Sequence, residues 1–230
     1  MAVLVSKPHL GRGTKRLELQ NKKNLFKRHQ IWRAVRERFL GEGGFGSVFL
    51  VKRNQPLNEY DKLTDLPSEM AVKTESMAQA SSLRYDKQVF SRFDPKIPNV
   101  IKCYGDKETI GCEGEKIYNL FLEFCSGGSH YDYINKSYSS SNGLLEQEAM
   151  KYTRDIVKGL FYIHGNGIVH CDIKPGNYML LVPGSGGGFT AKLVDFGLAK
   201  NMDDEDMEED SYRGTCSYMA PELVEDKILA

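Results

Sequence analysis

The sequence predicts an α+β protein with two lobes, a small antiparallel-sheet N-lobe followed by a mainly helical C-lobe. Strand-like segments dominate the first half of the chain, the longest helical pattern lies in the second half, and a glycine-containing break at 125–128 separates them. Strands that come first and helices that follow are typical of α+β architectures. We therefore expect a basic, flexible tail at 1–30, the sheet lobe at 31–124 and the helical lobe at 125–230.

The composition is that of an ordinary globular protein. Of 230 residues, 40% are apolar and 27% are charged, and 31 basic side chains balance 31 acidic ones. This balance excludes wholesale disorder and gives the whole chain no bias toward nucleic acid or anionic lipid. Five cysteines without a C-x-x-C pair favour reduced thiols inside a cell over disulfides or zinc. No apolar run approaches the ~20 residues of a membrane helix, so we expect a soluble protein of the cytoplasm or nucleus.

Charge is distributed unevenly along the chain. The first 28 residues carry eight Lys or Arg and one acidic residue, Glu18, whereas seven of the eight residues at 203–210 are acidic. Runs of charge are usually solvated. We therefore favour a flexible arm for the first segment, with a docking or localisation element as the alternative. For the acidic run we favour a solvated loop over a segment ordered against basic groups.

Local patterns predict the elements of each lobe. Strand-like composition marks the segments 31–40, 47–51, 70–73, 100–104, 117–124, 167–169, 178–182 and 190–194. A long polar connection occupies 53–69, and PGSGGG at 183–188 predicts a turn. Helical spacing predicts one helix at 145–164 and another at 76–93. The helix at 76–93 would place five side chains on one face: Leu83, Asp86, Val89, Phe90 and Phe93.

Three glycines follow the first strand in the pattern Gly41-x-Gly43-x-x-Gly46. A dinucleotide-binding fold is excluded because its glycines open a helix, while the segment after Gly46 is strand-like. A Walker A loop is excluded because Ser47 stands where that loop needs Lys. The remaining interpretations are a hairpin whose bare backbone can approach phosphate oxygens, or a purely structural turn.

The motif HCDIKPGN at 170–177 is more informative. Pro175 and Gly176 keep it out of a helix. It supplies a carboxylate, an amine two residues on and a carboxamide five residues on. Phosphoryl transfer uses such groups as a base for the incoming hydroxyl, a cation for the moving phosphoryl group and an oxygen ligand for Mg²⁺. The DFG sequence that begins at Asp195 follows a strand-like segment and adds a second carboxylate for magnesium.

Together these motifs resemble those of eukaryotic protein kinases. GEGGFGSV, MAVK, HCDIKPGN, DFG and APE occur in the family's order, from about residue 31 to 230. Lys174 within DIKPGN is similar to the serine/threonine class, and VIKCYG, FCSGGS and GTCSYMAPE are most similar to plant MAP kinase kinase kinases. The resemblance implies a bilobal kinase fold, ATP and Mg²⁺ as cofactors, and a protein substrate, which for this subfamily would be a MAP kinase kinase.

The resemblance also implies a role for each motif residue. Asp172 would accept the proton of the substrate hydroxyl, Lys174 would neutralise the moving phosphoryl group, and Thr215 would brace both. Asn177 and Asp195 would hold Mg²⁺. The carbonyl of Glu123 and the N–H of Cys125 would meet the adenine edge, so the identity of those two side chains says little. The implied ATP-binding set is Leu40, Gly41, Gly43, Gly46, Val48, Ala71, Lys73, Asp86, Leu122, Glu123 and Cys125.

The first departure from the family concerns Asp86, which stands where a Glu normally pairs with Lys73. Aspartate is one methylene shorter, so either the helix lies closer to Lys73 or water bridges the pair. Glu75, two residues from Lys73 on the same strand, is a poor substitute. We expect a weak pair and a partly inactive resting state.

The second departure is Cys171, which replaces the arginine before the catalytic aspartate. That arginine commonly grips a phosphate on the activation loop. A phospho-switch at Ser211, the nearest candidate, would therefore lack its main ligand.

The third departure is the end of the chain, eight residues after Glu222, where the family continues with several helices. We expect the C-lobe to be partial and residues 1–230 alone to express poorly, because the loss of a buried apolar layer is large against a total stability of about 5–15 kcal/mol.

These departures leave a second interpretation open: a truncated, catalytically silent module that presents its nucleotide cleft or its basic tail to partners. The intact residues Lys73, Asp172, Asn177 and Asp195 favour an enzyme, while Asp86 and the missing helices favour the silent module. We expect the histidines at 164 and 170 to be structural rather than metal ligands, and the sequence offers no account of His130.

Overall fold

The computed structural model describes residues 34–43, 46–53, 66–141, 143–176, 180–183, 188–203, 213–221 and 224. Several expectations concern residues outside this set: the basic tail, most of the polar connection after Arg53, the acidic run after Asp203, and three single residues, Asn177, Ser211 and Glu222. They stay predictions. Among the described residues, no helix combines the length and apolar character that crossing a membrane requires.

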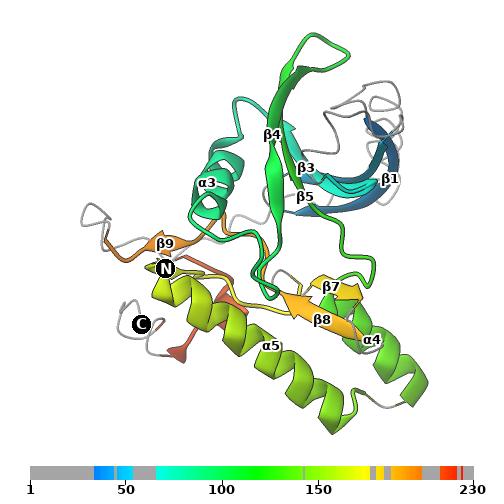
Figure 1. Cartoon of the computed structure of the whole chain (residues 1–230), viewed down its shortest axis with the longest axis vertical. Coiled ribbons are helices and arrows are strands. Elements are labelled where there is room, and N and C mark those ends of the chain that lie inside the picture. Colours follow the sequence, from blue (N-terminus) through cyan, green and yellow to red (C-terminus); the bar gives the residue numbers. More distant parts are fainter. Residues whose placement is uncertain are drawn as a thin grey trace, which may run out of the picture.

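The N-lobe is a five-stranded antiparallel sheet in the order β1-β2-β3-β5-β4 (Figure 1). Its strands are β1 (Ala34–Gly43), β2 (Gly46–Arg53), β3 (Glu69–Ser76), β4 (Cys103–Ile110) and β5 (Lys116–Glu123). The glycine-rich segment joins β1 to β2, and Gly43 pairs with Gly46 across the turn. Ala71 and Lys73 lie two residues apart on β3 and therefore share one face of the sheet, opposite Leu122 and Leu120 of β5.

Helix α3 (Ser81–Phe90) packs beside the sheet (Figure 1). The prediction of a helix at 76–93 was right in type but too long at both ends. The N–H of Met77 still bonds to the carbonyl of Lys116, which continues the pairing beyond β3, and tight turns follow Phe90. The predicted face is buried as expected, and it carries Leu83, Asp86, Val89 and Phe90.

The segment 100–102 was wrongly predicted as the start of a strand at 100–104. β4 begins only at Cys103, because this segment leaves the sheet and bonds to the C-lobe. Val100 forms a parallel bridge with Leu193. The N–H of Leu193 donates to the carbonyl of Asn99, and the N–H of Ile101 donates to the carbonyl of Leu193, both at 2.9 Å. The segment therefore joins the two lobes directly.

The described part of the C-lobe contains α4 (His130–Ser141), α5 (Glu146–Gly165) and two small two-stranded sheets. β6 (Ile168–Val169) pairs with β9 (Lys200–Asn201), and β7 (Leu180–Pro183) pairs with β8 (Phe189–Lys192). The predictions of α5 and of the β7–β8 hairpin are confirmed, although β8 ends before the predicted residue 194. Figure 1 shows α5 running beneath the sheet lobe, with the β7–β8 hairpin beside it.

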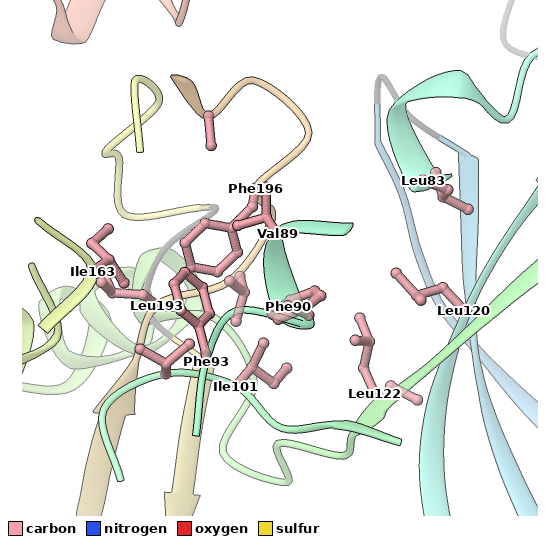
Figure 2. Close-up of a cluster of buried hydrophobic side chains, with 14 of the residues drawn as sticks. Leu83, Val89, Phe90, Phe93, Ile101, Leu120, Leu122, Ile163, Leu193 and Phe196 are labelled. Carbon is pink, nitrogen blue, oxygen red and sulfur yellow. The ribbon is translucent and has the colours of Figure 1, made fainter. Parts of the chain in front are cut away.

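A hydrophobic cluster connects α3 with the C-lobe (Figure 2). Phe196 is fully buried, and its ring lies 5.2 Å from Phe90 and 5.3 Å from Phe93, centroid to centroid. His170 contacts the same ring at 4.9 Å. Burial of a large apolar side chain contributes about 1.5–3 kcal/mol. The cluster therefore fixes the end of α3 against the segments that carry Asp195 and the HCDIKPGN motif.

Candidate active site

A cavity of about 370 Å³ lies between the sheet and the C-lobe. This volume is within the range of small-molecule sites. Apolar side chains of β2, β3 and β5 form one wall, and Asp195 and Gly176 of the C-lobe contribute to the other. The predicted ATP-binding residues that line the cavity are Leu40, Gly41, Val48, Ala71, Lys73, Asp86, Leu122, Glu123 and Cys125.

Two glycines of the predicted ATP-binding set, Gly43 and Gly46, are not among the residues that line the cavity; they pair with each other at the turn of the β1–β2 hairpin. Their role in ATP binding stays a prediction. Lining residues that the predicted ATP-binding set did not include come from β1, the end of α3, the interlobe segments, the start of α4 and the C-lobe loops: Arg38, Glu42, Phe90, Ile101, Phe124, Ser126, Gly128, Ser129, Asp132, Gly176 and Val194. Ser129 and Asp132 had a further sequence signal, because a Ser-x-x-Asp pattern marks a helix start.

Lys73 lies between two carboxylates inside the cavity. Its Nζ is 3.2 Å from Oδ2 of Asp86 on α3 and 2.7 Å from Oδ1 of Asp195. The side chain of Asp86 is 1% exposed and that of Asp195 is 22% exposed. Of the two arrangements expected for the shorter aspartate, the structure has the close helix and a direct contact. Whether the pair limits activity stays a prediction.

Burial and charge compete in this cluster. Burial opposes the charge on Lys73, but the two nearby carboxylates outweigh it and raise the pKa of the ammonium group. Burial raises the pKa of the Asp86 carboxyl to about 6, because Lys73 offsets the loss of solvation only in part and Asp195 adds a like charge. Lys73 therefore forms ion pairs with two carboxylates at once, and it only partly stabilises the ionised form of Asp86.

A second cluster joins Asp172, Lys174 and Thr215. The hydroxyl of Thr215 donates to Oδ1 of Asp172 at 2.7 Å, and Nζ of Lys174 lies 2.8 Å from Oδ2 of Asp172 and 2.6 Å from the Thr215 hydroxyl oxygen. Burial raises the pKa of Asp172, but the bonds from Lys174 and Thr215 outweigh burial and leave the pKa below its ordinary value. Asp172 is therefore ionised at neutral pH.

Gly214 allows Thr215 to reach Asp172. Its φ is +118°, in the region that favours glycine, and a Cβ there would overlap the carbonyl oxygen of Cys171. The backbone at Gly214 therefore lies closer to the backbone at Cys171 than a residue with a side chain would permit.

His170 connects the two clusters. Its Nδ1 accepts from the N–H of Asp172 at 3.3 Å, so its Nε2 carries the proton and donates to the carbonyl of Val194 at 2.8 Å. Val194 immediately precedes Asp195. Burial lowers the pKa of His170 and keeps the ring neutral. The described residues include no group of three or more His, Cys, Asp or Glu that could hold a metal, and the contacts of His170 are those of a structural residue.

Two residues of these loops adopt a left-handed backbone: Cys171 and Asp195 each have φ of 63°. Such conformations are uncommon outside glycine and cost of order 1–3 kcal/mol. Both residues lie next to the His170 bonds just described, which hold the loops in place. Strain of this kind gathers at functional sites, where it aims a side chain.

Two basic residues lie near Cys171, which replaces the family's arginine. Burial raises the pKa of the Cys171 thiol, and the positive charges of Arg213 and Lys200 oppose that rise. Arg213 also donates to the carbonyl of Ala199 at 2.9 Å. Positive charge is therefore present beside the position where the arginine is missing.

His130, for which the sequence offered no account, begins α4 and belongs to an aromatic cluster. The side chain of His130 is buried. Its ring packs edge-on against Tyr152, with the ring centroids 5.0 Å apart, and stacks on Tyr133 at a centroid distance of 6.4 Å. Burial lowers the pKa of its imidazole. The residue therefore acts as a packed core side chain at the base of α4.

Comparisons with known proteins agree with this geometry. The family model of the protein kinase domain matches residues 34–229. Mitogen-activated protein kinase kinase kinase 20 of Arabidopsis thaliana is 35% identical over 84% of this chain and 53% of its own length. Mitogen-activated protein kinase kinase kinase 17 of the same plant is 32% identical, over 82% of this chain and 45% of that protein. The alpha subunit of the inhibitor of nuclear factor kappa-B kinase from Xenopus laevis is 32% identical over 82% of this chain.

The two-lobed fold and these matches define the class as a protein kinase domain. The chain belongs to the protein kinase family. It spans about half the length of the two plant relatives.

Proposed function

We propose that this chain is an ATP-dependent serine/threonine protein kinase that transfers the γ-phosphoryl group of ATP to a protein hydroxyl. The observation that carries the proposal is the arrangement of two lysine–carboxylate clusters: Lys73 and Asp195 line the cavity, and Lys174 with Asp172 is linked to them through His170. The similarity to plant MAP kinase kinase kinases points to a MAP kinase kinase as the substrate.

The cavity residues suit a nucleotide. Val48, Ala71 and Leu122 supply apolar surface for a planar base. The carbonyl of Glu123 and the N–H of Cys125 would meet the adenine edge, and the ammonium of Lys73 would contact the phosphates. When bound, Mg²⁺ neutralises phosphate charge, and carboxylate and amide oxygens are the ligands it prefers. Asp195, directed at the cavity, and Asn177 would hold it.

The Asp172 cluster suits the transfer step. Because the Asp172 carboxylate is ionised, it can accept a hydrogen bond from the substrate hydroxyl and aim the hydroxyl oxygen at the γ-phosphorus. As the new oxygen–phosphorus bond forms and the bond to ADP breaks, the hydroxyl proton passes to Asp172. Such help is typically worth about 10²–10⁴ in rate. Lys174 would neutralise charge on the moving phosphoryl group while Thr215 holds Asp172 and Lys174 together.

Transfer of radiolabelled phosphate tests this proposal. The chain is incubated with Mg²⁺ and γ-labelled ATP, and with a generic basic protein or a MAP kinase kinase, beside its Asp172→Asn variant. We expect label on serine or threonine of the acceptor with the parent chain and almost none with the variant. A nucleotide-dependent rise in melting temperature without any transfer by the parent chain would contradict the proposal and support the catalytically silent binding module.

A further inference from the structure

The side chain of Glu123, at the end of β5, makes contacts that its proposed backbone role does not require. Its Oε2 accepts from Nζ of Lys192 at 2.8 Å and from the backbone N–H of Lys102 at 3.1 Å. The Lys192 and Glu123 side chains are 11% and 21% exposed. An ion pair so far withdrawn from solvent is screened much less than one on the surface.

The three partners come from different parts of the molecule. Glu123 ends the strand that leads into the interlobe connection, and its N–H also donates to the carbonyl of Lys102 at 2.9 Å. Lys102 ends the segment that bonds to Leu193. Lys192 ends β8, three residues before Asp195. One carboxylate oxygen therefore ties the adenine end of the cavity to the chain that carries Asp195.

Resting on the proposed function, we propose that Glu123 and Lys192 form a positioning pair for nucleotide binding. The pair holds the carbonyl of Glu123 and the N–H of Cys125, two residues on, at a fixed place relative to the C-lobe wall of the cavity. Neither side chain reacts with ATP. Their contribution is to hold the adenine-binding backbone in place before the nucleotide arrives, which lowers the ordering cost of binding.

The alternative is a purely structural ion pair, and it predicts a different result. A structural pair would change the melting temperature and leave nucleotide affinity unchanged in protein that remains folded. A positioning pair acts on the adenine end, so its loss weakens the binding of adenosine and of MgATP by the same factor. A defect transmitted to Asp195 instead would weaken MgATP and spare adenosine.

Four variants of the full chain test the proposal. Lys192→Met removes the charge and keeps the stem length, Glu123→Gln keeps an oxygen for the Lys102 N–H, and Lys192→Arg restores a donor. Lys52→Met is the matched control, because Lys52 forms exposed ion pairs with Glu37 and Glu69 on the N-lobe sheet. The readouts are the dissociation constants of adenosine and MgATP, together with KM and kcat for transfer.

We expect Lys192→Met to raise both dissociation constants and the KM for ATP by roughly five- to tenfold, about the net effect of one hydrogen bond, with kcat changed less than about twofold. Glu123→Gln should fall between Lys192→Met and the parent, and Lys192→Arg and Lys52→Met should match the parent. Unchanged adenosine affinity in folded Lys192→Met protein would overturn the inference. Binding is measured separately from transfer, so the two proposals can fail separately. A parent chain that binds MgATP without transferring phosphate would contradict the proposed function alone. A parent chain that binds no nucleotide would overturn the proposed function and the positioning pair together.

Discussion

Two aspartates of the site, Asp86 and Asp172, contact a lysine and are almost fully buried, yet the pKa values of their carboxyl groups move in opposite directions. Asp86 shares Lys73 with Asp195, and its pKa rises to about 6. Asp172 receives bonds from Lys174 and from the Thr215 hydroxyl, and its pKa falls. A nearby lysine therefore does not by itself keep a buried carboxylate ionised; the depth of burial, the competing carboxylates and the further donors together decide.

The largest expected effects separate the two clusters. Asp172→Asn should lower kcat by about 10²–10⁴ while ATP affinity stays near that of the parent, because Asp172 does not line the nucleotide cavity. Asp195→Asn should lower both kcat and the affinity for MgATP, since it removes the carboxylate beside Lys73 and a proposed metal ligand. Steady-state kinetics and calorimetry on the two variants check this difference. Loss of MgATP affinity in Asp172→Asn would break the comparison.

A smaller loss is expected from Thr215→Val, which removes the hydroxyl with little change of shape. Loss of one hydrogen bond to a charged group should cost roughly 1.5–3 kcal/mol in the transition state, or about 10- to 100-fold in kcat. Because that bond lowers the Asp172 pKa, its removal should raise the pKa of the Asp172 carboxyl, which NMR titration of labelled aspartate in the folded protein measures. Thr190→Val, on β8, is the control. An unchanged Asp172 pKa in Thr215→Val would show that Thr215 does not stabilise ionised Asp172.

The Asp86 cluster should respond with a modest gain. Asp86→Glu restores the longer side chain, and we expect activity to rise a few-fold, with a small loss of stability because an added methylene must be packed in a fully buried site. In the parent chain, activity should also fall as pH drops below about 6, where Asp86 takes up a proton and no longer shares Lys73 with Asp195. Initial rates across pH 5–8 measure both effects; an unchanged or lower rate in Asp86→Glu would contradict the weak-pair hypothesis.

The smallest effect concerns stability at the aromatic cluster. Burial depresses the His130 pKa below its unfolded value of 6.5, so the folded state binds fewer protons and stability falls as pH drops below about 6.5. His130→Phe should reduce this loss, by about 2–4 °C of melting temperature for each 1 kcal/mol recovered. Melting curves at pH 5.5 and 7.5 compare it with His164→Phe, an exposed position. The remaining pH dependence belongs to other groups, including His170, whose pKa burial also lowers. Equal pH dependence in the parent and His130→Phe would contradict the assignment.

The sequence was sufficient where local chemistry is strong. The strands around the glycine-rich hairpin and α5 follow from composition and spacing. The contact of Lys73 with Asp86 and the grouping of Asp172 with Lys174 and Thr215 follow once the resemblance to kinases is recognised. In these features the type of each residue by itself restricts the local structure it can adopt or the chemical role it can take.

Contacts between distant segments could not be predicted. The strand-like composition of 100–104 is real, but residues 99–101 bond to Leu193 instead of extending β4. Helix α4 was not predicted, because its hydrophobic residues show only a weak helical period. The sequence feature that marks its start is Ser129, whose hydroxyl oxygen accepts from the N–H of Asp132 at 3.1 Å. The Glu123–Lys192 pair joins positions 69 residues apart, a relation that no local pattern contains.

The account's central claim is that both lysine–carboxylate clusters act on one bound nucleotide. An ATP analogue with an acylating group on its terminal phosphate tests this most directly, because it transfers the acyl group to whichever amine lies beside that phosphate. Mass spectrometry after reaction with the full chain should locate the label on Lys73 and Lys174, and excess MgATP should prevent it at both. Label confined to other lysines, or label at these two that MgATP does not prevent, would contradict the claim.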